Sequence, residues 1–200
     1  MHQVKFLPWE GLHYSKGFNG VRTLVLGESH YQWNRGRDIK EWREVTRTLV
    51  QEQLDGGYTK AFWTNIAFTF LNRAPSLDDK RAFWSSVAFY NYVQESAGGA
   101  ARLAPKDESW QASEGAFSTV LHQLKPEFIL VLGYRLWKRL PPMNRTEAAD
   151  GYGWAYRYDG GSAVVYGIRH PSSGFNARKW HDRVVTALKK ANSKSSTLPR

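Results

Sequence analysis

A histidine followed by a proline and two serines, His170 to Ser173, stands near the carboxyl end of the chain. A residue before proline is held towards an extended backbone, so we expect the His170 ring to stand at the end of a strand. The two serines and Gly174 are small and let a phosphate backbone approach closely. An imidazole fixed beside a phosphate-sized notch suits chemistry on a nucleotide. The alternative is a turn histidine that only caps a strand.

Two apolar runs elsewhere in the chain also carry polar residues that could do chemistry. Residues 21–27 are typical of a buried strand. Gly27 ends this strand, and four functional side chains follow it: Glu28, Ser29, His30 and Tyr31. Residues 61–70 predict a second strand with Asn65 at its centre. An amide in such an apolar run is costly to bury without partners, which favours a dedicated role for Asn65.

The three segments, taken in order, resemble the motifs of the uracil-DNA glycosylase superfamily. In that family a strand leads to a glycine, an acid or amide, a small turn and an aromatic residue. A middle strand holds a base-reading asparagine, and the last motif is His-Pro-Ser. The segment Lys125–Gly133 is similar to the family's penultimate strand, so the resemblance spans most of residues 21 to 190. It implies a monofunctional DNA glycosylase that flips out uracil or a modified pyrimidine and leaves an abasic site.

The resemblance implies a role for two of these side chains at the base. His170 would donate a hydrogen bond to the pyrimidine O2 as the base leaves, and such a preorganised donor supplies roughly 3–4 kcal/mol. Asn65 would read the base, since one donor and one acceptor match the O4 and N3–H edge of uracil. The same amide, flipped, matches a cytosine-type edge, so the choice of base stays open.

The first motif departs from the best-known branch of the family, because Ser29 stands where that branch has a water-orienting aspartate. Glu28 is our first choice to orient the nucleophile and His30 the second, with a loop-bracing role for Glu28 as the alternative. Gly27 and Tyr31 would line the base site. If Tyr31 crowds the pyrimidine C5 position, uracil fits and thymine is rejected. If the loop at residues 32–37 swings it aside, a larger C5 substituent enters.

The last motif also implies contacts with DNA. Phe175 falls where the family inserts an apolar wedge into the duplex. The hydroxyls of Ser172 and Ser173 would bond phosphate oxygens. Three basic side chains near them add charge: Arg169, Arg178 and Lys179. A solvated helix end is the alternative for Arg178 and Lys179, whereas Arg169 would contact phosphate or reach a base substituent. The run at residues 89–92 is predicted to be core, although Asn91 and Tyr92 remain candidates for contact with the base.

The elements around the motifs alternate between helix and strand. We expect four longer helices, over about 38–54, 76–95, 109–124 and 177–191, and a short helix that ends at residue 140. We also expect a strand at 128–132 and a hairpin formed by residues 152–158 and 163–168. Asp38 is the predicted N-cap of the first helix, and Gly56 and Gly57 its stop. The pattern predicts a three-layer α/β/α sandwich with a mainly parallel central sheet of about four strands. Ligands of such folds collect at the carboxyl ends of strands, where all three motifs fall. Residues 1–192 are expected to form a single domain and 193–200 a flexible tail.

Composition limits the partners and cofactors. The 200 residues include 28 Lys and Arg against 18 Asp and Glu, a net charge of +10 that favours a polyanion such as DNA. Nine Trp, ten Tyr and ten Phe supply rings for stacking. The absence of cysteine excludes disulfides, thiolate zinc sites and iron–sulfur clusters. We expect a cytoplasmic, monomeric protein without metal or other cofactor, and no apolar run approaches membrane-spanning length.

Two alternatives keep the fold but change the function. The missing aspartate and the segment after Tyr31 would suit a glycosylase for hypermodified cytosine in phage DNA, which is a role in defence. The missing aspartate would also suit a non-catalytic DNA-binding module. A nucleotide-binding protein of another family is disfavoured, because the chain has no phosphate-cradling Gly-x-x-x-x-Gly-Lys pattern and no dinucleotide glycine fingerprint.

Overall fold

Four parallel strands form the centre of the sheet in the computed structural model, which describes residues 4–31, 42–56, 60–96, 103–142, 146–147, 153–172 and 174–195. In spatial order they are β3 (Val87–Asn91), β2 (Thr23–Gly27), β4 (Phe128–Leu132) and β7 (Gly161–Ile168). Antiparallel strands extend both edges: β1 (Trp9–Glu10) beside β3, then β6 (Gly153–Tyr158) and β5 (Thr146–Glu147) beside β7. The predicted α/β class with a parallel centre is confirmed, and the antiparallel edges enlarge the sheet to seven strands.

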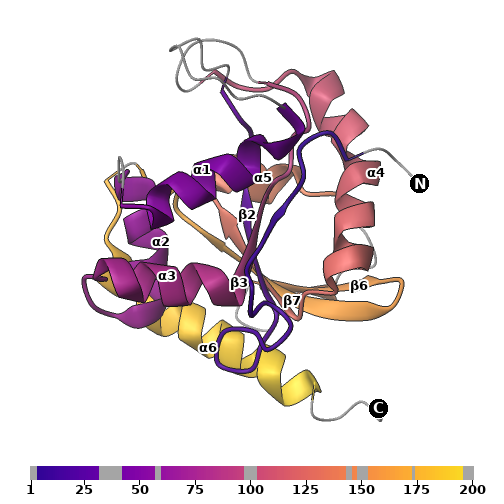
Figure 1. The fold of residues 1–200 in the computed structure, drawn as a ribbon. Coiled ribbons are helices and arrows are strands. Elements are labelled where there is room, and N and C mark those ends of the chain that lie inside the picture. Colours follow the sequence, from indigo (N-terminus) through magenta and orange to yellow (C-terminus); the bar gives the residue numbers. More distant parts are fainter. Residues whose placement is uncertain are drawn as a thin grey trace.

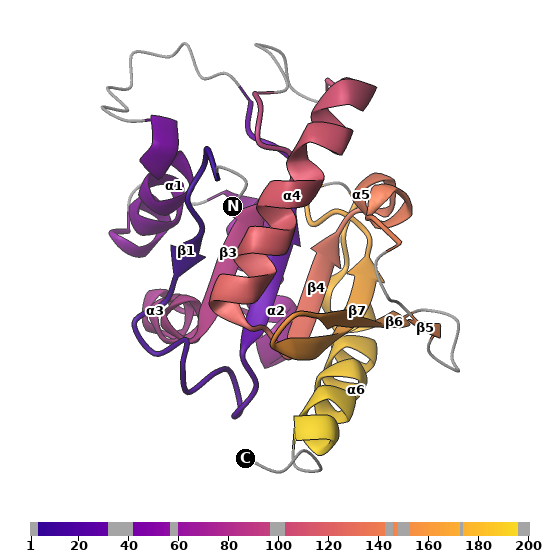
Figure 2. The ribbon, with the colours of Figure 1, turned by 90° about the vertical axis from the view of Figure 1, so that its right-hand side faces the viewer.

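Helices cover both faces of this sheet (Figures 1 and 2). One face carries α1 (Val45–Leu54), α2 (Ala61–Leu71), α3 (Leu77–Ser86) and α6 (Ala177–Ser195), with the short 3-10 helix η1 (Trp42–Glu44) before α1. The other face carries α4 (Asp107–Leu124) and α5 (Tyr134–Arg139). Along β2, Leu24 and Leu26 pack towards α4 while Val25 packs towards α2. Strands enclosed in this way have every residue buried, which explains their continuous apolar sequences.

Two predicted elements have the opposite secondary structure. Residues 61–70, predicted as a strand around Asn65, form the helix α2. A helix packed among α3, α6 and the sheet is apolar on most of its surface, and a short apolar run of this kind does not distinguish helix from strand. The helix predicted over 76–95 ends at Ser86, and the following residues form β3. Its start is correct, because Ser76 and Asp79 make a capping box.

The other predicted elements agree with the structure apart from their ends. Helix α4, strand β4 and the β6–β7 hairpin lie where they were expected, with Gly160 at a φ of +83° in the hairpin turn. Helix α6 continues to Ser195, so the first residues of the predicted tail are helical. Asp38, Gly57 and residues 196–200 lie outside the described residues. In the part of the chain that the structure describes, no helix is both long and apolar enough to traverse a bilayer.

Candidate functional site

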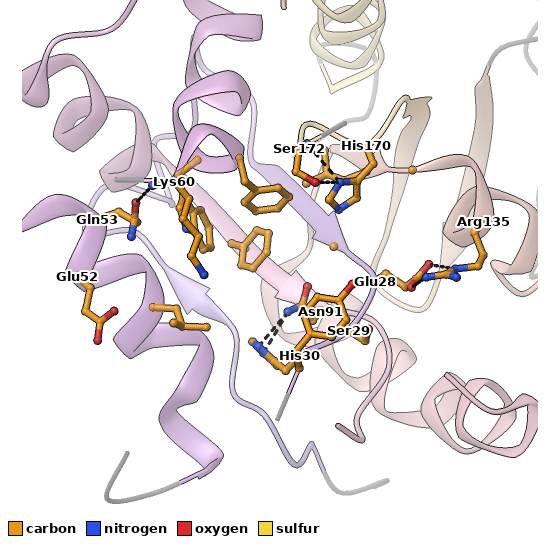
Figure 3. Close-up of a pocket in the computed structure, with 18 of the residues that line it drawn as sticks. Glu28, Ser29, His30, Glu52, Gln53, Lys60, Asn91, Arg135, His170 and Ser172 are labelled. Carbon is orange, nitrogen blue, oxygen red and sulfur yellow. Dashed lines mark hydrogen bonds and ion pairs between the residues drawn. The ribbon is translucent and has the colours of Figure 1, made fainter. Parts of the chain in front are cut away.

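The site lies where the chain reverses direction across the sheet. Among the four parallel strands, β2 comes first in the chain. The next two, β3 and β4, pair with opposite sides of it. In open parallel sheets such a switch point leaves a crevice beyond the carboxyl ends of the strands. A pocket of about 480 Å³ occupies this place (Figure 3). Its wall includes residues from the ends of all four parallel strands: Gly27 to Tyr31, Asn91, Leu132 to Arg135, His170 and Ser172.

His170 follows β7 and points into the pocket (Figure 3). Its ring stacks on Phe62 of α2, with centroids 5.4 Å apart and an interplanar angle of 30°. The Ser172 backbone N–H donates to Nδ1 at 3.3 Å, and the Ser172 hydroxyl lies 2.8 Å from the same nitrogen. Because an N–H can only donate, Nδ1 accepts, and the neutral ring carries its proton on Nε2. Burial lowers the pKa of His170, with Glu28 opposing this shift and Arg135 adding to it. The neutral form is therefore the one present at pH 7.

Asn91 ends β3 and brings a carboxamide into the pocket beside Gly27. Its Nδ2 lies 3.2 Å from Nδ1 and 3.1 Å from Nε2 of His30. Its Oδ1 lies directly over Gly27, only 2.1 Å from the position that a Cβ would take there. Glycine at position 27 is therefore required by space rather than by backbone conformation. The carboxamide is held with its nitrogen towards His30, and Figure 3 shows its oxygen on the side of His170.

His30 lies behind Asn91 and is almost fully buried, with 3% of its surface exposed. Its Nε2 is 2.9 Å from Oγ1 of Thr46 on α1, and Phe6 packs edge-on against its ring at 5.1 Å. Burial lowers the pKa of His30 to about 4, so the ring is neutral at physiological pH. These contacts place His30 as a support for Asn91, whereas its predicted role as a second choice for orienting water stays untested.

The buried His30 predicts a loss of stability in mild acid. The folded pKa is about 4 against an ordinary value of 6.5, so between these pH values the unfolded chain binds a proton that the folded chain does not. The free energy of unfolding should fall by about 1.4 kcal/mol per pH unit through this window. In urea denaturation, wild type should lose about 2–3 kcal/mol more than His30→Gln between pH 7 and pH 4.5. His122→Gln, which removes an exposed imidazole, should behave as wild type. Equal losses in wild type and His30→Gln would contradict the prediction.

Glu28 stands at the mouth of the pocket in an ion pair with Arg135 of α5 (Figure 3). Arg135 Nε donates to Oε2 at 2.7 Å, and its second nitrogen donates to Oε1 in a bidentate arrangement. The Glu28 side chain is mostly buried, with 13% exposed, and the pair raises the pKa of Arg135. A carboxylate held at both oxygens is fixed in place and can orient a donor.

Ser29 and Tyr31 also line the pocket. The Ser29 hydroxyl is buried, and no other described residue forms a hydrogen bond with it. A buried polar group without a protein partner is costly and is often satisfied by water or a ligand. The segment after Tyr31, including residues 32–37, lies outside the described residues.

Asn65 does not take the place predicted for it. The residue is on helix α2 and its side chain is not part of the pocket wall. Its Nδ2 donates to the backbone carbonyl of Pro171 at 2.8 Å. The amide therefore holds the turn that presents His170, and Asn91 supplies the only asparagine side chain of the pocket among the described residues.

The predicted DNA-contacting residues surround the His170 turn. Ser172 is exposed and lines the pocket, whereas Ser173 lies outside the described residues. Phe175 is half-buried against the core beneath α6. Three basic residues are exposed: Arg169 before the turn, and Arg178 and Lys179 in the first turn of α6. Arg178 also lies over the Phe68 ring, at 5.9 Å from its centroid.

Sequence reasoning missed two contributors to the site and gave a third only a secondary place. Asn91 is a candidate for contact with the base inside a run predicted to be core, and it ends a run of Val, Ala, Phe and Tyr much as Gly27 ends its own strand. Arg135 was not considered, because its partner Glu28 is 107 positions away. Phe62, which stacks on His170, belongs to the run taken for a strand. Of these, only Asn91 had a signal in the sequence, namely a polar residue at the end of an apolar β-prone run.

Comparison with known proteins adds no family assignment: no protein-family model matches the chain, and no curated protein matches it.

Proposed function

We propose that the protein is a DNA glycosylase of the uracil-DNA glycosylase superfamily type, acting on uracil or a modified pyrimidine as a monomer in the cytoplasm. The observation that carries the proposal is the pairing of a neutral histidine and a fixed carboxamide in one pocket. His170 and Asn91 are 79 positions apart in the chain, yet both line the crevice at the carboxyl ends of the parallel strands. Such convergence is what an everted base would need for recognition and departure.

His170 supports the departure of the base. Cleavage of the N-glycosidic bond leaves negative charge on the base, chiefly at its carbonyl oxygens. The Nε2–H of a neutral ring can donate to the pyrimidine O2 as this charge grows. Ser172 holds Nδ1 and Phe62 holds the ring plane, so the donor is oriented before the reaction begins. Preorganisation of this kind avoids the cost of reorienting dipoles during the reaction.

Asn91 supports recognition of a uracil-type edge. Starting from the His170 side, the pocket offers a donor, then the acceptor Oδ1, then the second hydrogen on Nδ2. Uracil presents the complementary order: the acceptor O2, the donor N3–H and the acceptor O4. Cytosine has an acceptor at N3 and a donor at N4, and would meet this amide in the wrong orientation.

Glu28 and Ser29 support the attack by water on the sugar. The Glu28 carboxylate, held by Arg135, would favour the positive charge of the sugar in the transition state. Glu28 remains our first choice for orienting the nucleophile, with the Ser29 hydroxyl beside it as a second polar contact. The exposed Ser172 and the basic residues Arg169, Arg178 and Lys179 would hold the phosphate backbone, and Phe175 would fill the vacated stack.

Base release from defined duplexes tests the proposal. Wild-type protein should convert a labelled duplex with a single uracil into a product that breaks only after alkali, because a monofunctional glycosylase leaves an abasic site. Duplexes with cytosine or thymine at the same position serve as matched controls and should remain intact. Tight, salt-dependent DNA binding without base release from any duplex would contradict the enzyme and favour a binding module instead.

The size of the pocket favours a second candidate, a glycosylase for hypermodified pyrimidines in phage DNA. A volume of about 480 Å³ lies within the range that encloses a whole drug-sized ligand. The α1–α2 side of the pocket carries polar side chains, Glu52, Gln53 and Lys60, beside apolar ones from the same two helices (Figure 3). A sugar-like substituent would find hydrogen-bonding groups there. Release of bases from hypermodified phage DNA, but not from the uracil duplex, would favour this candidate, whereas action only on unmodified DNA would eliminate it.

A further inference from the structure

We propose that His30 and Thr46 are positioning residues that together fix the orientation of the Asn91 carboxamide, and thereby decide which pyrimidine edge the pocket accepts. The inference rests on the proposed function in one respect, which is that Asn91 contacts the base. Under this proposal, the choice between pyrimidine bases is controlled by His30 and Thr46, a buried pair that does not itself contact the reacting groups.

The three side chains form a continuous buried chain from helix α1 to the pocket. Thr46, His30 and Asn91 are exposed by 0%, 3% and 7% respectively. Thr46 Oγ1 lies 2.9 Å from His30 Nε2, and Asn91 Nδ2 lies 3.2 Å from His30 Nδ1 and 3.1 Å from Nε2. Water has little access to these groups, so each polar atom depends on its neighbour in the chain for a hydrogen bond.

A neutral imidazole couples the two ends of this chain. It has one N–H and one bare nitrogen, so a donor must face one side and an acceptor the other. With the proton on Nε2, the ring donates to Thr46 Oγ1, and the bare Nδ1 accepts an N–H of Asn91. With the proton on Nδ1, the bare Nε2 would be shared by the Thr46 hydroxyl and the Asn91 N–H, and the Nδ1–H would face the carboxamide without an acceptor unless the Asn91 oxygen turned towards it. The structure has the Asn91 nitrogen facing the ring, within reach of both ring nitrogens, and Nδ1 is the one that stays bare when Nε2 donates to Thr46.

The surrounding packing holds the chain in place. Phe6 contacts the His30 ring edge-on, with the two rings at 83°. Gln94 ties this segment to the strand: its Nε2 donates to the Asn91 carbonyl at 2.9 Å, and its Oε1 accepts from the Phe6 N–H at 2.9 Å. Rotation of the Asn91 side chain thus has to be accommodated by the His30–Thr46 pair. The tautomer of a buried ring becomes the determinant of base choice.

The tautomer can be measured in the ligand-free protein, before any question of catalysis. We expect ¹⁵N NMR of the His30 imidazole to show a bare Nδ1 and a protonated Nε2 at pH 7. Thr46→Val keeps the shape of the side chain but removes the acceptor for Nε2–H, so it should shift the ring towards the Nδ1–H tautomer. Thr46→Ser should retain the wild-type signals. A bare Nε2 in wild type, or identical spectra for wild type and Thr46→Val, would overturn the proposal.

Base preference supplies the second measurement. Thr46→Val should reduce the ratio of uracil to cytosine release by about tenfold or more, as expected from the loss of one buried hydrogen bond. Thr46→Ser should restore the ratio. If Thr46→Val lowers stability but leaves the ratio unchanged, the pair is only structural and the proposal is wrong. If wild type releases no base at all, the proposed function fails, while the NMR result still decides the tautomer and its link to Asn91.

Discussion

Replacing His170 by alanine is expected to slow base release by about 10²–10³-fold. The change removes the Nε2–H donor that faces the pocket. Only water then stabilises the negative charge that develops on the departing base. Ser172 is exposed, and Phe62 keeps its contacts with Trp63 and Phe89 when the His170 ring is removed, so the fold should persist. Single-turnover rates on a uracil duplex measure the effect directly.

Three comparisons make this result specific. DNA affinity should change little, because the phosphate contacts proposed for Ser172 and the basic residues remain. His122→Ala, which removes an exposed histidine of α4, should release base at the wild-type rate. Circular dichroism and denaturation should show a folded protein for both variants. Equal single-turnover rates for wild type and His170→Ala would contradict the assignment of His170 as the donor to the base.

Replacing Gly27 by alanine is expected to lower base release by about 10²-fold, because a misplacement of roughly 1 Å at a reacting group has an effect of this size. The new Cβ would lie 2.1 Å from Asn91 Oδ1 and 3.1 Å from Phe89 Cζ. Asn91 must then move, and its contact with His30 is lost. Overpacking of this kind also costs about 1–3 kcal/mol of stability.

A double-mutant cycle separates the clash from a general effect on β2. Asn91→Ala removes the atom that the methyl group introduced by Gly27→Ala would strike, so the two changes combined should be less destabilising than the sum of the single changes predicts. Activity should stay low in the double variant, because the carboxamide proposed to contact the base is absent. Strict additivity of the unfolding free energies would show that Asn91 is not the residue that Gly27 accommodates.

The sequence predicted the α/β class, the parallel centre of the sheet and the turn that carries His170, because these depend on local patterns. Strand β4 is a run of five apolar residues between turn signals. In helix α4 the apolar residues recur with the 3.6-residue period of a helix and form a stripe along one side. The His-Pro dipeptide likewise limits its own backbone. Each of these features can be judged from residues that are neighbours in the chain.

The sequence exchanged the roles of Asn65 and Asn91 for a physical reason. Both residues lie in apolar runs with aromatic side chains, and burial on all sides removes the periodicity that tells helix from strand. Only the tertiary structure shows that residues 61–71 pack between helices whereas residues 87–91 pair with β2. The ion pair of Glu28 with Arg135 was equally inaccessible, since nothing local relates residues 107 positions apart.

The wide spacing of the pocket residues along the chain has a consequence for how the protein matures during synthesis. The first wall of the pocket is translated at Gly27, but the turn that carries His170 follows 143 positions later. Helix α6, which packs on α2 and β7, is later still. Pairing of such distant strands is intrinsically slow, because loop closure must precede the contacts that compensate for it. The nascent polypeptide therefore cannot form this crevice until the His170 turn and helix α6 have been translated.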